Sequence, residues 1–346
     1  MLPMRTICTF ALLALLSPVA VTGAAADAPA QPARAAPSTN APWRVAAQEK
    51  IPRFIRERDM GTTGLMIVVG GKTMYTFGDV REVSYIASCR KSVLSMLYGK
   101  YVRNGTIDLN ETVGALGIDD VGGLLPLEKT ATVRDLLTAR SGCYHPAANA
   151  GGVSEKNAPP RGKTKPGTKF VYNNWDFNVA GTVFEMKTKQ SIYDAFERDI
   201  AVPLQLQDWN RALHQRSGDA SKSVHLAYHF HLSTRDMARL GELMLRRGKW
   251  NGAQVIPADW VDESTRRIVD LGKRGGYGYM WWTEASKRYP KEYAGAFAAH
   301  GMYGQRITVL PALDMVIAHK SARNAAHPTK GADYSALVEL IVGLAR

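Results

Sequence analysis

The chain has 346 residues, of which 45% are hydrophobic and 22% are charged, and its formal net charge is +13. This ordinary globular composition excludes a disordered chain, a collagen and a small disulfide-rich domain. The length allows about two domains of roughly 150 residues each. The positive charge by itself leaves nucleic-acid binding, contact with an anionic surface and simple solubility open.

The first 26 residues are typical of a secretory signal peptide. Arg5 precedes an apolar run that ends near Leu16, and the alanines at 24–26 offer a small-residue cleavage pattern. The apolar run is shorter than the about 20 residues that a membrane-spanning helix needs. Residues 27–42 are rich in Ala and Pro, which favours a linker. We therefore expect a periplasmic or secreted protein without stable membrane insertion.

Helical and extended patterns then follow in a definite order. Helices are expected over residues 44–60, 88–102, 132–139, 175–187, 191–201, 233–247 and 333–345. Strands are expected over residues 65–69, 73–77, 279–282, 305–310 and 315–319. Since strands lie near both ends of the chain and helices between them, the order predicts one sheet domain (43–100 and 271–346) with a mainly helical domain (101–270) inserted into it.

The segment from Ser88 to Lys91 has the spacing S-x-x-K at the start of an expected helix. Residues three apart share a helix face, so Lys91 can reach the Ser88 hydroxyl. A serine becomes a good nucleophile when a neighbouring base takes its proton, and a lysine can act as that base when burial lowers its pKa. The backbone N–H groups of the helix N-terminus can stabilise an oxyanion. A surface serine and lysine would show the same spacing.

Two further segments carry polar groups suited to the same chemistry. Tyr172 could transfer a proton if a nearby ammonium lowered its pKa, and Asn174 could hydrogen-bond a lysine and a substrate carbonyl. These two residues also fit a buried tyrosine and a turn asparagine. Gly301 permits a close approach of the backbone to an acyl group, and the N–H of Met302 could be a second oxyanion donor.

These three segments, in this order, resemble the serine β-lactamase and penicillin-binding-protein superfamily, in its class C-like branch with the motifs S-x-x-K and Y-x-N. The resemblance runs from about Trp43 to the C-terminus. It implies an α/β (α+β) fold, in which an antiparallel sheet is flanked by N- and C-terminal helices. It also implies that Ser88 is the acylated nucleophile and that Lys91 and Tyr172 transfer protons.

The resemblance further implies that Asn174 positions Lys91 and the substrate, and that the backbone amides of Ser88 and Met302 form the oxyanion hole. The third motif departs from the family pattern of Lys-Thr-Gly or His-Thr-Gly, because Ala299 and His300 precede Gly301. In β-lactamases this motif helps to bind the substrate carboxylate. The departure favours an esterase or amidase, and His300 remains a candidate substrate contact.

We therefore expect an exported serine hydrolase that acts on a small amide, ester, β-lactam or peptide substrate through an acyl-enzyme. The alternative is a non-catalytic penicillin-binding-like module that binds or senses the cell wall. No DNA-reading pattern is present, so nucleic acid is not expected as a partner. The basic surface could contact anionic polymers of the cell envelope or steer an anionic substrate.

The remaining candidate residues give weaker signals. Cys89 and Cys143 could form a disulfide or be two small buried residues. His225, His229 and His231 lie close together, but their spacing matches no common zinc motif, so a solvated or capping role is expected for them. No metal and no cofactor is expected.

Overall fold

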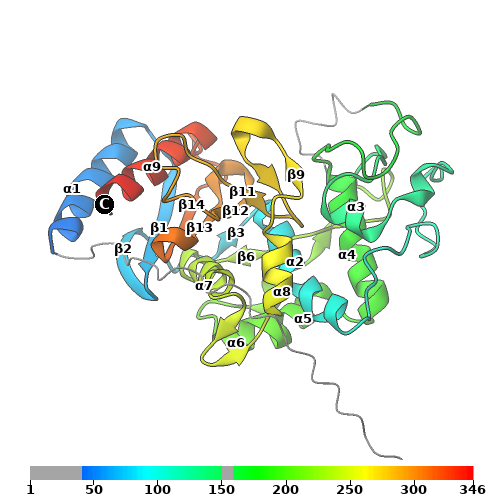
Figure 1. Ribbon diagram of the computed structural model, residues 1–346, viewed down its shortest axis with the longest axis horizontal. Helices are drawn as coiled ribbons and strands as arrows, with labels where there is room; N and C mark the ends of the chain where they lie inside the picture. The colour runs from blue at the N-terminus through cyan, green and yellow to red at the C-terminus, as the bar shows by residue number, and fades with distance from the viewer. Residues whose placement is uncertain (1–40, 150–158, 346) are drawn as a thin grey trace, which may run out of the picture. The chain divides into compact units, whose positions relative to one another are not determined.

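The centre of the protein is an antiparallel sheet, seen in the computed structural model, which describes residues 41–149 and 159–345. Within these residues eight strands follow the order β2-β1-β14-β13-β12-β11-β10-β9 (Figure 1). The strands are β1 (Thr62–Val69), β2 (Lys72–Gly78), β9 (Val269–Asp270), β10 (Gly276–Tyr277), β11 (Trp282–Thr283), β12 (Phe297–His300), β13 (Arg306–Leu310) and β14 (Met315–Ser321). Strands from both ends of the chain are therefore neighbours, since β1 pairs with β14.

The two faces of this sheet are covered by different helices because side chains alternate along each strand. On β1, Leu65 and Ile67 face one hydrophobic core, which they share with Ile317 of β14. Val68 and Val316, each one residue along its strand, face the other core. Helices α1 (Ala41–Glu57) and α9 (Gly331–Leu344) contribute to the first core and pack against each other, as Figure 1 shows.

The second face carries α2 (Cys89–Arg103), which contacts β12, and α7 (Thr234–Leu245), which contacts β1, β13 and β14. Helix α7 begins after Ser233, whose side chain accepts a hydrogen bond from the backbone N–H of Asp236. Gly241 lies at the contact between α7 and the sheet: a Cβ atom there would be 2.5 Å from a methyl carbon of Val316. The absence of a side chain at this position lets the helix approach the sheet closely.

The rest of the described chain consists of short elements. The other α-helices are α3 (Val133–Leu137), α4 (Asn174–Thr188), α5 (Ile192–Phe196), α6 (Val202–Leu204) and α8 (Ala258–Ser264). Three strand pairs lie outside the large sheet: β3 (Ser84–Tyr85) with β6 (His231–Leu232), β4 (Arg216–Ser217) with β5 (Ala227–Tyr228), and β7 (Lys249–Trp250) with β8 (Ala253–Gln254). A π-helical turn, η3 (Glu197–Ala201), follows α5, and 3-10 turns are η1 (Glu128–Thr130), η4 (Arg211–Leu213), η5 (Gly272–Arg274), η6 (Met302–Gly304) and η7 (Pro311–Leu313).

The predicted fold class is confirmed, and both predicted hairpins form, as β1–β2 and β13–β14. The strand predicted over residues 279–282 is wrong except at Trp282, where β11 begins. Residues 278–281 form a turn between β10 and β11, in which Met280 has a φ of +60°. The backbone N–H of Met280 donates to Leu137 and its carbonyl accepts from Ser92, so this apolar segment is buried against helices rather than paired as a strand.

The predicted signal peptide and most of the predicted linker lie outside the described residues, and α1 already begins at Ala41. The described residues belong to one compact unit. Helix α7 falls within the range 101–270 that was predicted as an insert, yet it packs on the large sheet. The division into a sheet domain and an inserted domain stays a prediction. No helix in the described ranges is long and apolar enough to cross a membrane.

Candidate active site

The site is organised by the first turn of α2, which begins directly after Ser88. Lys91 lies one turn further along, and its Nζ is 2.9 Å from Ser88 Oγ. The same Nζ is 2.8 Å from Tyr172 Oη and 2.8 Å from Asn174 Oδ1, both from the start of α4 or the residues just before it. The structure therefore brings together the four side chains that the S-x-x-K and Y-x-N patterns predicted.

The backbone beside Ser88 is held in an unusual conformation. Ala87 has a φ of +49°, a left-handed conformation that is unfavourable for alanine. The end of β12 approaches this segment so closely that a Cβ on Gly301 would be 2.6 Å from the carbonyl oxygen of Ile86. The glycine expected at this position is thus needed for the close approach of two backbones, and it places Met302 at the rim of the same cavity as Ser88.

A cavity of about 440 Å³ opens over Ser88. Its walls are formed by Tyr85, Ala87, Ser88, Arg90, Asn149, Tyr172, Asn174, Gln215, Ser217, His229, His231, Met302, Tyr303 and Arg323. Cavities of this size accommodate small-molecule substrates. Of the predicted site residues, Ser88, Tyr172, Asn174 and Met302 line it, while Lys91 reaches Ser88 from behind the wall.

Lys91 is 1% exposed, and burial lowers the pKa of its ammonium well below the usual value. The positive charge of the neighbouring Arg90 lowers this pKa further. The pKa of Tyr172 moves the other way: removal from water raises it, although a hydrogen bond with Ser88 opposes the rise. The expected depression of the Tyr172 pKa is therefore absent, because the loss of hydration outweighs the hydrogen bond with Ser88 and the positive charge of Arg90, which both lower this pKa.

His300 does not reach the cavity over Ser88. Its Nε2 lies 2.7 Å from Oε1 of Glu284, on the wall of a different, smaller cavity. Its ring stacks on Trp282 with 5.4 Å between ring centroids, and Trp282 in turn stacks on Tyr172 at 5.4 Å. His300 thus supports Tyr172 through Trp282, and the structure does not bring it to the place expected for a substrate contact.

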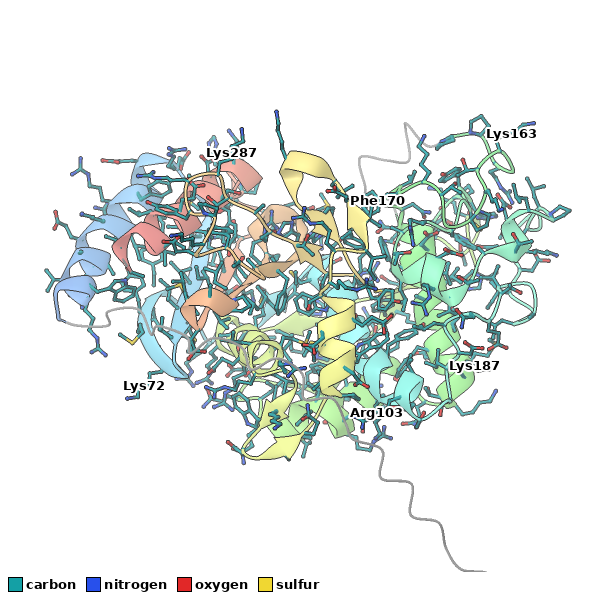
Figure 2. The ribbon with its side chains drawn as sticks, in the orientation of Figure 1. Lys72, Arg103, Lys163, Phe170, Lys187 and Lys287 are labelled. Carbon is teal, nitrogen blue, oxygen red and sulfur yellow. The ribbon has the colours of Figure 1, made fainter. Side chains whose placement is uncertain are left out.

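The aromatic rings around Tyr172 extend this support. Phe170, labelled in Figure 2, lies with its ring centroid 5.3 Å from that of Tyr277 and 6.2 Å from that of Trp282. Tyr277 also contacts Tyr172 edge-on at 6.1 Å. Such ring pairs each add a modest stabilisation. The phenol of Tyr172 is therefore held in one orientation beside Lys91.

Sequence reasoning missed Arg90 as a site residue and set His229 and His231 aside as solvated or capping residues, yet all three line the cavity. Arg90 could have been noticed, because it is a charged residue at the start of a helix whose other residues are mostly apolar and buried. The two histidines lie on and beside β6, and only the pairing of β6 with β3 brings them near Ser88.

The two cysteines of the described chain are both free and buried, so the disulfide considered from the sequence does not form. Cys89 Sγ contacts the carbonyl oxygen of Gln305, and Cys143 Sγ that of Glu128. They occupy separate positions as small buried side chains. Within the described ranges no group of three or more His, Cys, Asp or Glu side chains could hold a metal ion.

The sequence matches the β-lactamase family over residues 47–340. The chain belongs to the β-lactamase family. Over 100 residues it is 29% identical to the 6-aminohexanoate-dimer hydrolase of Paenarthrobacter ureafaciens, a stretch that covers 26% of this chain and 24% of that enzyme. The match thus spans about a quarter of the length of this curated relative. The family and its named relatives include hydrolases of the serine β-lactamase type.

Solved structures share the fold at low sequence identity. A putative 6-aminohexanoate-dimer hydrolase from Bacillus anthracis has a TM-score of 0.65 and 19% identity, covering 85% of this chain and 81% of that one. A penicillin-binding-protein homologue from Caulobacter crescentus has a TM-score of 0.64 and 14% identity, covering 89% and 98%. A mutant class C β-lactamase has a TM-score of 0.66 and 13% identity, covering 87% and 97%. These similarities confirm the predicted β-lactamase/transpeptidase-like fold.

Proposed function

We propose that this protein is an exported serine hydrolase that cleaves an amide or ester bond through an acyl-enzyme on Ser88. The observation that carries the proposal is the position of Lys91 Nζ, within 2.9 Å of Ser88 Oγ, Tyr172 Oη and Asn174 Oδ1. A neutral amine has two N–H groups and one lone pair. It can donate to Asn174 and Tyr172 while it accepts the proton of Ser88.

The first half-reaction forms the acyl-enzyme. Lys91 takes the proton of Ser88 as Oγ attacks the substrate carbonyl, which gives a tetrahedral oxyanion and a Lys91 ammonium. The backbone amides of Ser88 and Met302 stabilise the oxyanion. The carbonyl re-forms and the bond to the leaving group breaks, while the leaving group receives its proton from Lys91 through the neutral phenol of Tyr172.

The second half-reaction releases the acyl group. The leaving group departs with its proton, so Lys91 is neutral again and can accept a proton from water. The resulting hydroxide attacks the ester carbonyl, and the tetrahedral intermediate collapses with transfer of the proton back to Ser88 Oγ. The lowered pKa of Lys91 suits this role, because an amine with its usual pKa would be protonated at neutral pH and could accept no proton.

The altered third motif favours a substrate other than a β-lactam. One relative and one structural neighbour of the chain carry the name 6-aminohexanoate-dimer hydrolase, an enzyme of amide hydrolysis. Ala299 is a fully buried alanine where β-lactamases usually carry a basic residue. We therefore propose a linear amide or an ester as the substrate, and a periplasmic or secreted location on the basis of the N-terminal sequence.

Labelling with a fluorescent fluorophosphonate tests the proposed chemistry. We expect the wild-type protein to be modified and Ser88→Ala to remain unmodified. Ser95→Ala is the matched control, because Ser95 lies on the same helix with its hydroxyl buried and without a partner in the described structure. Equal labelling of wild type and Ser88→Ala, or no labelling of the wild type by either fluorophosphonate or penicillin, would show that the proposal is wrong.

A hydrolysis panel then separates the substrate classes. It contains p-nitrophenyl esters, D-amino-acid amides, linear ω-amino-acid amides and nitrocefin, each measured with wild type and Ser88→Ala. Turnover of an ester or linear amide that Ser88→Ala abolishes supports the hydrolase. Slow acylation of Ser88 without turnover of any of them supports the alternative, a non-catalytic binding or sensor module, for which the altered residues before Gly301 are the specific observation.

A further inference from the structure

The cavity over Ser88 carries positive charge without a matching negative charge. Two arginines, Arg90 and Arg323, line it, and no aspartate or glutamate is among its described lining residues. Burial lowers the pKa of His229 to about 4 and also lowers that of His231, so both imidazoles are neutral at neutral pH. The arginines are therefore the charges that a substrate meets there.

Arg90 is unusual because its guanidinium is buried yet incompletely paired. The residue is 1% exposed, its Nη2 donates to Oδ1 of Asn178 at 3.1 Å, and its Cζ lies 4.3 Å from the centroid of the Tyr228 ring. Its Nη1 is buried without a hydrogen-bond partner. No carboxylate of the described chain forms an ion pair with Arg90. Its burial also sets it apart from basic residues such as Lys163 and Lys287, labelled in Figure 2, whose side chains are exposed to water.

A buried cation with no counter-charge is unfavourable unless something compensates it. The guanidinium presents paired N–H donors whose geometry matches the two oxygens of a carboxylate. Arg90 and Ser88 line the same cavity, so a molecule that fills this cavity can place a carbonyl at Ser88 and a second group at Arg90. Ala299 places no cation at the position where the family's third motif usually has one.

We propose that Arg90 binds a carboxylate group of the substrate, so that the enzyme prefers esters or amides that carry a free carboxylate near the scissile bond. The proposal rests on the proposed hydrolase function and names its substrate class. Arg323, which is exposed at the rim of the same cavity with its Cζ 5.7 Å from the centroid of the Tyr85 ring, adds positive charge but has water as an alternative partner.

The test compares two pairs of esters in which one member carries a carboxylate and the other a neutral group at the same position. The first pair, mono-p-nitrophenyl glutarate and p-nitrophenyl pentanoate, varies the acyl part. The second, 4-acetoxybenzoate and 4-acetoxybenzamide, varies the leaving group. The measured quantity is the ratio of kcat/KM for the charged ester to that for the neutral ester. An effect of Arg90 on the pKa of Lys91 alters both members of a pair alike and cancels in this ratio.

We expect the wild type to prefer the charged ester in at least one pair, and Arg90→Met to lower that ratio about 10- to 100-fold. Arg323→Met is the matched control, for which we expect a change below about threefold. The proposal is overturned if the wild type prefers the charged ester in neither pair, or if Arg90→Met and Arg323→Met lower the ratio equally. The latter result would indicate a general positive field.

A measurement on the wild type alone covers the case in which Arg90→Met fails to fold. Glutarate should slow both fluorophosphonate labelling and hydrolysis of p-nitrophenyl pentanoate, while the neutral glutaramide should not. Equal effects of the two compounds would contradict the carboxylate subsite. Absence of labelling and of hydrolysis in the wild type would instead refute the proposed function, so the two failures are distinguishable.

Discussion

Replacement of Asn174 by aspartate tests whether Lys91 must be neutral. Asn174 Oδ1 lies 2.8 Å from Lys91 Nζ, so Asn174→Asp puts a carboxylate there with almost no change in shape. At an effective dielectric constant of about 20 the attraction between charges 2.8 Å apart is about 6 kcal/mol. Burial of the new carboxylate offsets roughly half of it or more. The remaining about 3 kcal/mol would raise the pKa of Lys91 by about two units.

The assay for this change is the rate of fluorophosphonate labelling of Ser88 between about pH 5 and 10, which requires no knowledge of the natural substrate. We expect the acid limb of the pH profile to move up by about two units in Asn174→Asp, with a roughly 100-fold slower rate on that limb and recovery at high pH. The new charge suits the first turn of α4, because helix N-termini favour anions.

The control is Asn174→Ala, which removes the acceptor without adding charge and should not move the acid limb upward. If the acid limb of folded Asn174→Asp coincided with that of the wild type, protonation of Lys91 would not limit the reaction. The role of Lys91 as the base would then be wrong.

Three further predictions concern stability. Burial lowers the pKa of His319 to about 4, so between about pH 6.5 and pH 4 this side chain is protonated in the unfolded chain but not in the folded chain. The protein should therefore lose about 3 kcal/mol of stability as the pH falls from about 6.5 to 4. Urea unfolding of His319→Gln should show a smaller loss over the same pH range. Burial raises the pKa of Asp176 to about 8, so the folded chain holds a proton that the unfolded chain releases above about pH 4. Stability from this group should fall as the pH rises from 4 to 8, and Asp176→Asn should gain melting temperature relative to wild type over that range; a constant difference would contradict the assignment. Gly241→Leu should clash with Val316 and lower the free energy of unfolding by about 1–3 kcal/mol or more, measured in urea, whereas an unchanged midpoint would mean that α7 can shift on the sheet.

The parts of the site that the sequence could predict are those set by local geometry or by family resemblance. The S-x-x-K spacing places Ser88 and Lys91 on one helix face whatever the rest of the chain does. The contact between Lys91 and Tyr172 joins residues 81 positions apart, and only the resemblance indicated it. The role of His300 could not be predicted, because it depends on Glu284 and Trp282, which reach it through the pairing of β11 with β12.

The strand prediction over residues 279–282 failed for a similar reason. Residues 279–281 are apolar and buried, and Met280 bonds to helix residues, but an apolar run does not reveal whether its backbone pairs with a strand or with a helix end. The hairpins were predictable since the turn and the alternation lie in one short segment. Arg90 was missed because a sequence shows that a residue is charged but not that its charge lacks a partner.

The first turn of α2 also bears on how this protein can evolve and be engineered. Arg90 places a positive charge in a helical turn that favours negative ones, the turn contains no acidic residue, and the Ser88 side chain makes no capping hydrogen bond. The side chains of this turn that serve the reaction therefore destabilise the N-terminus of α2. The packing of the buried residues in the rest of α2 must compensate for this loss of stability. Selection for heat resistance alone should favour inactive sequences at this turn, such as Lys91→Met, whereas a thermostable active variant must gain its stability elsewhere.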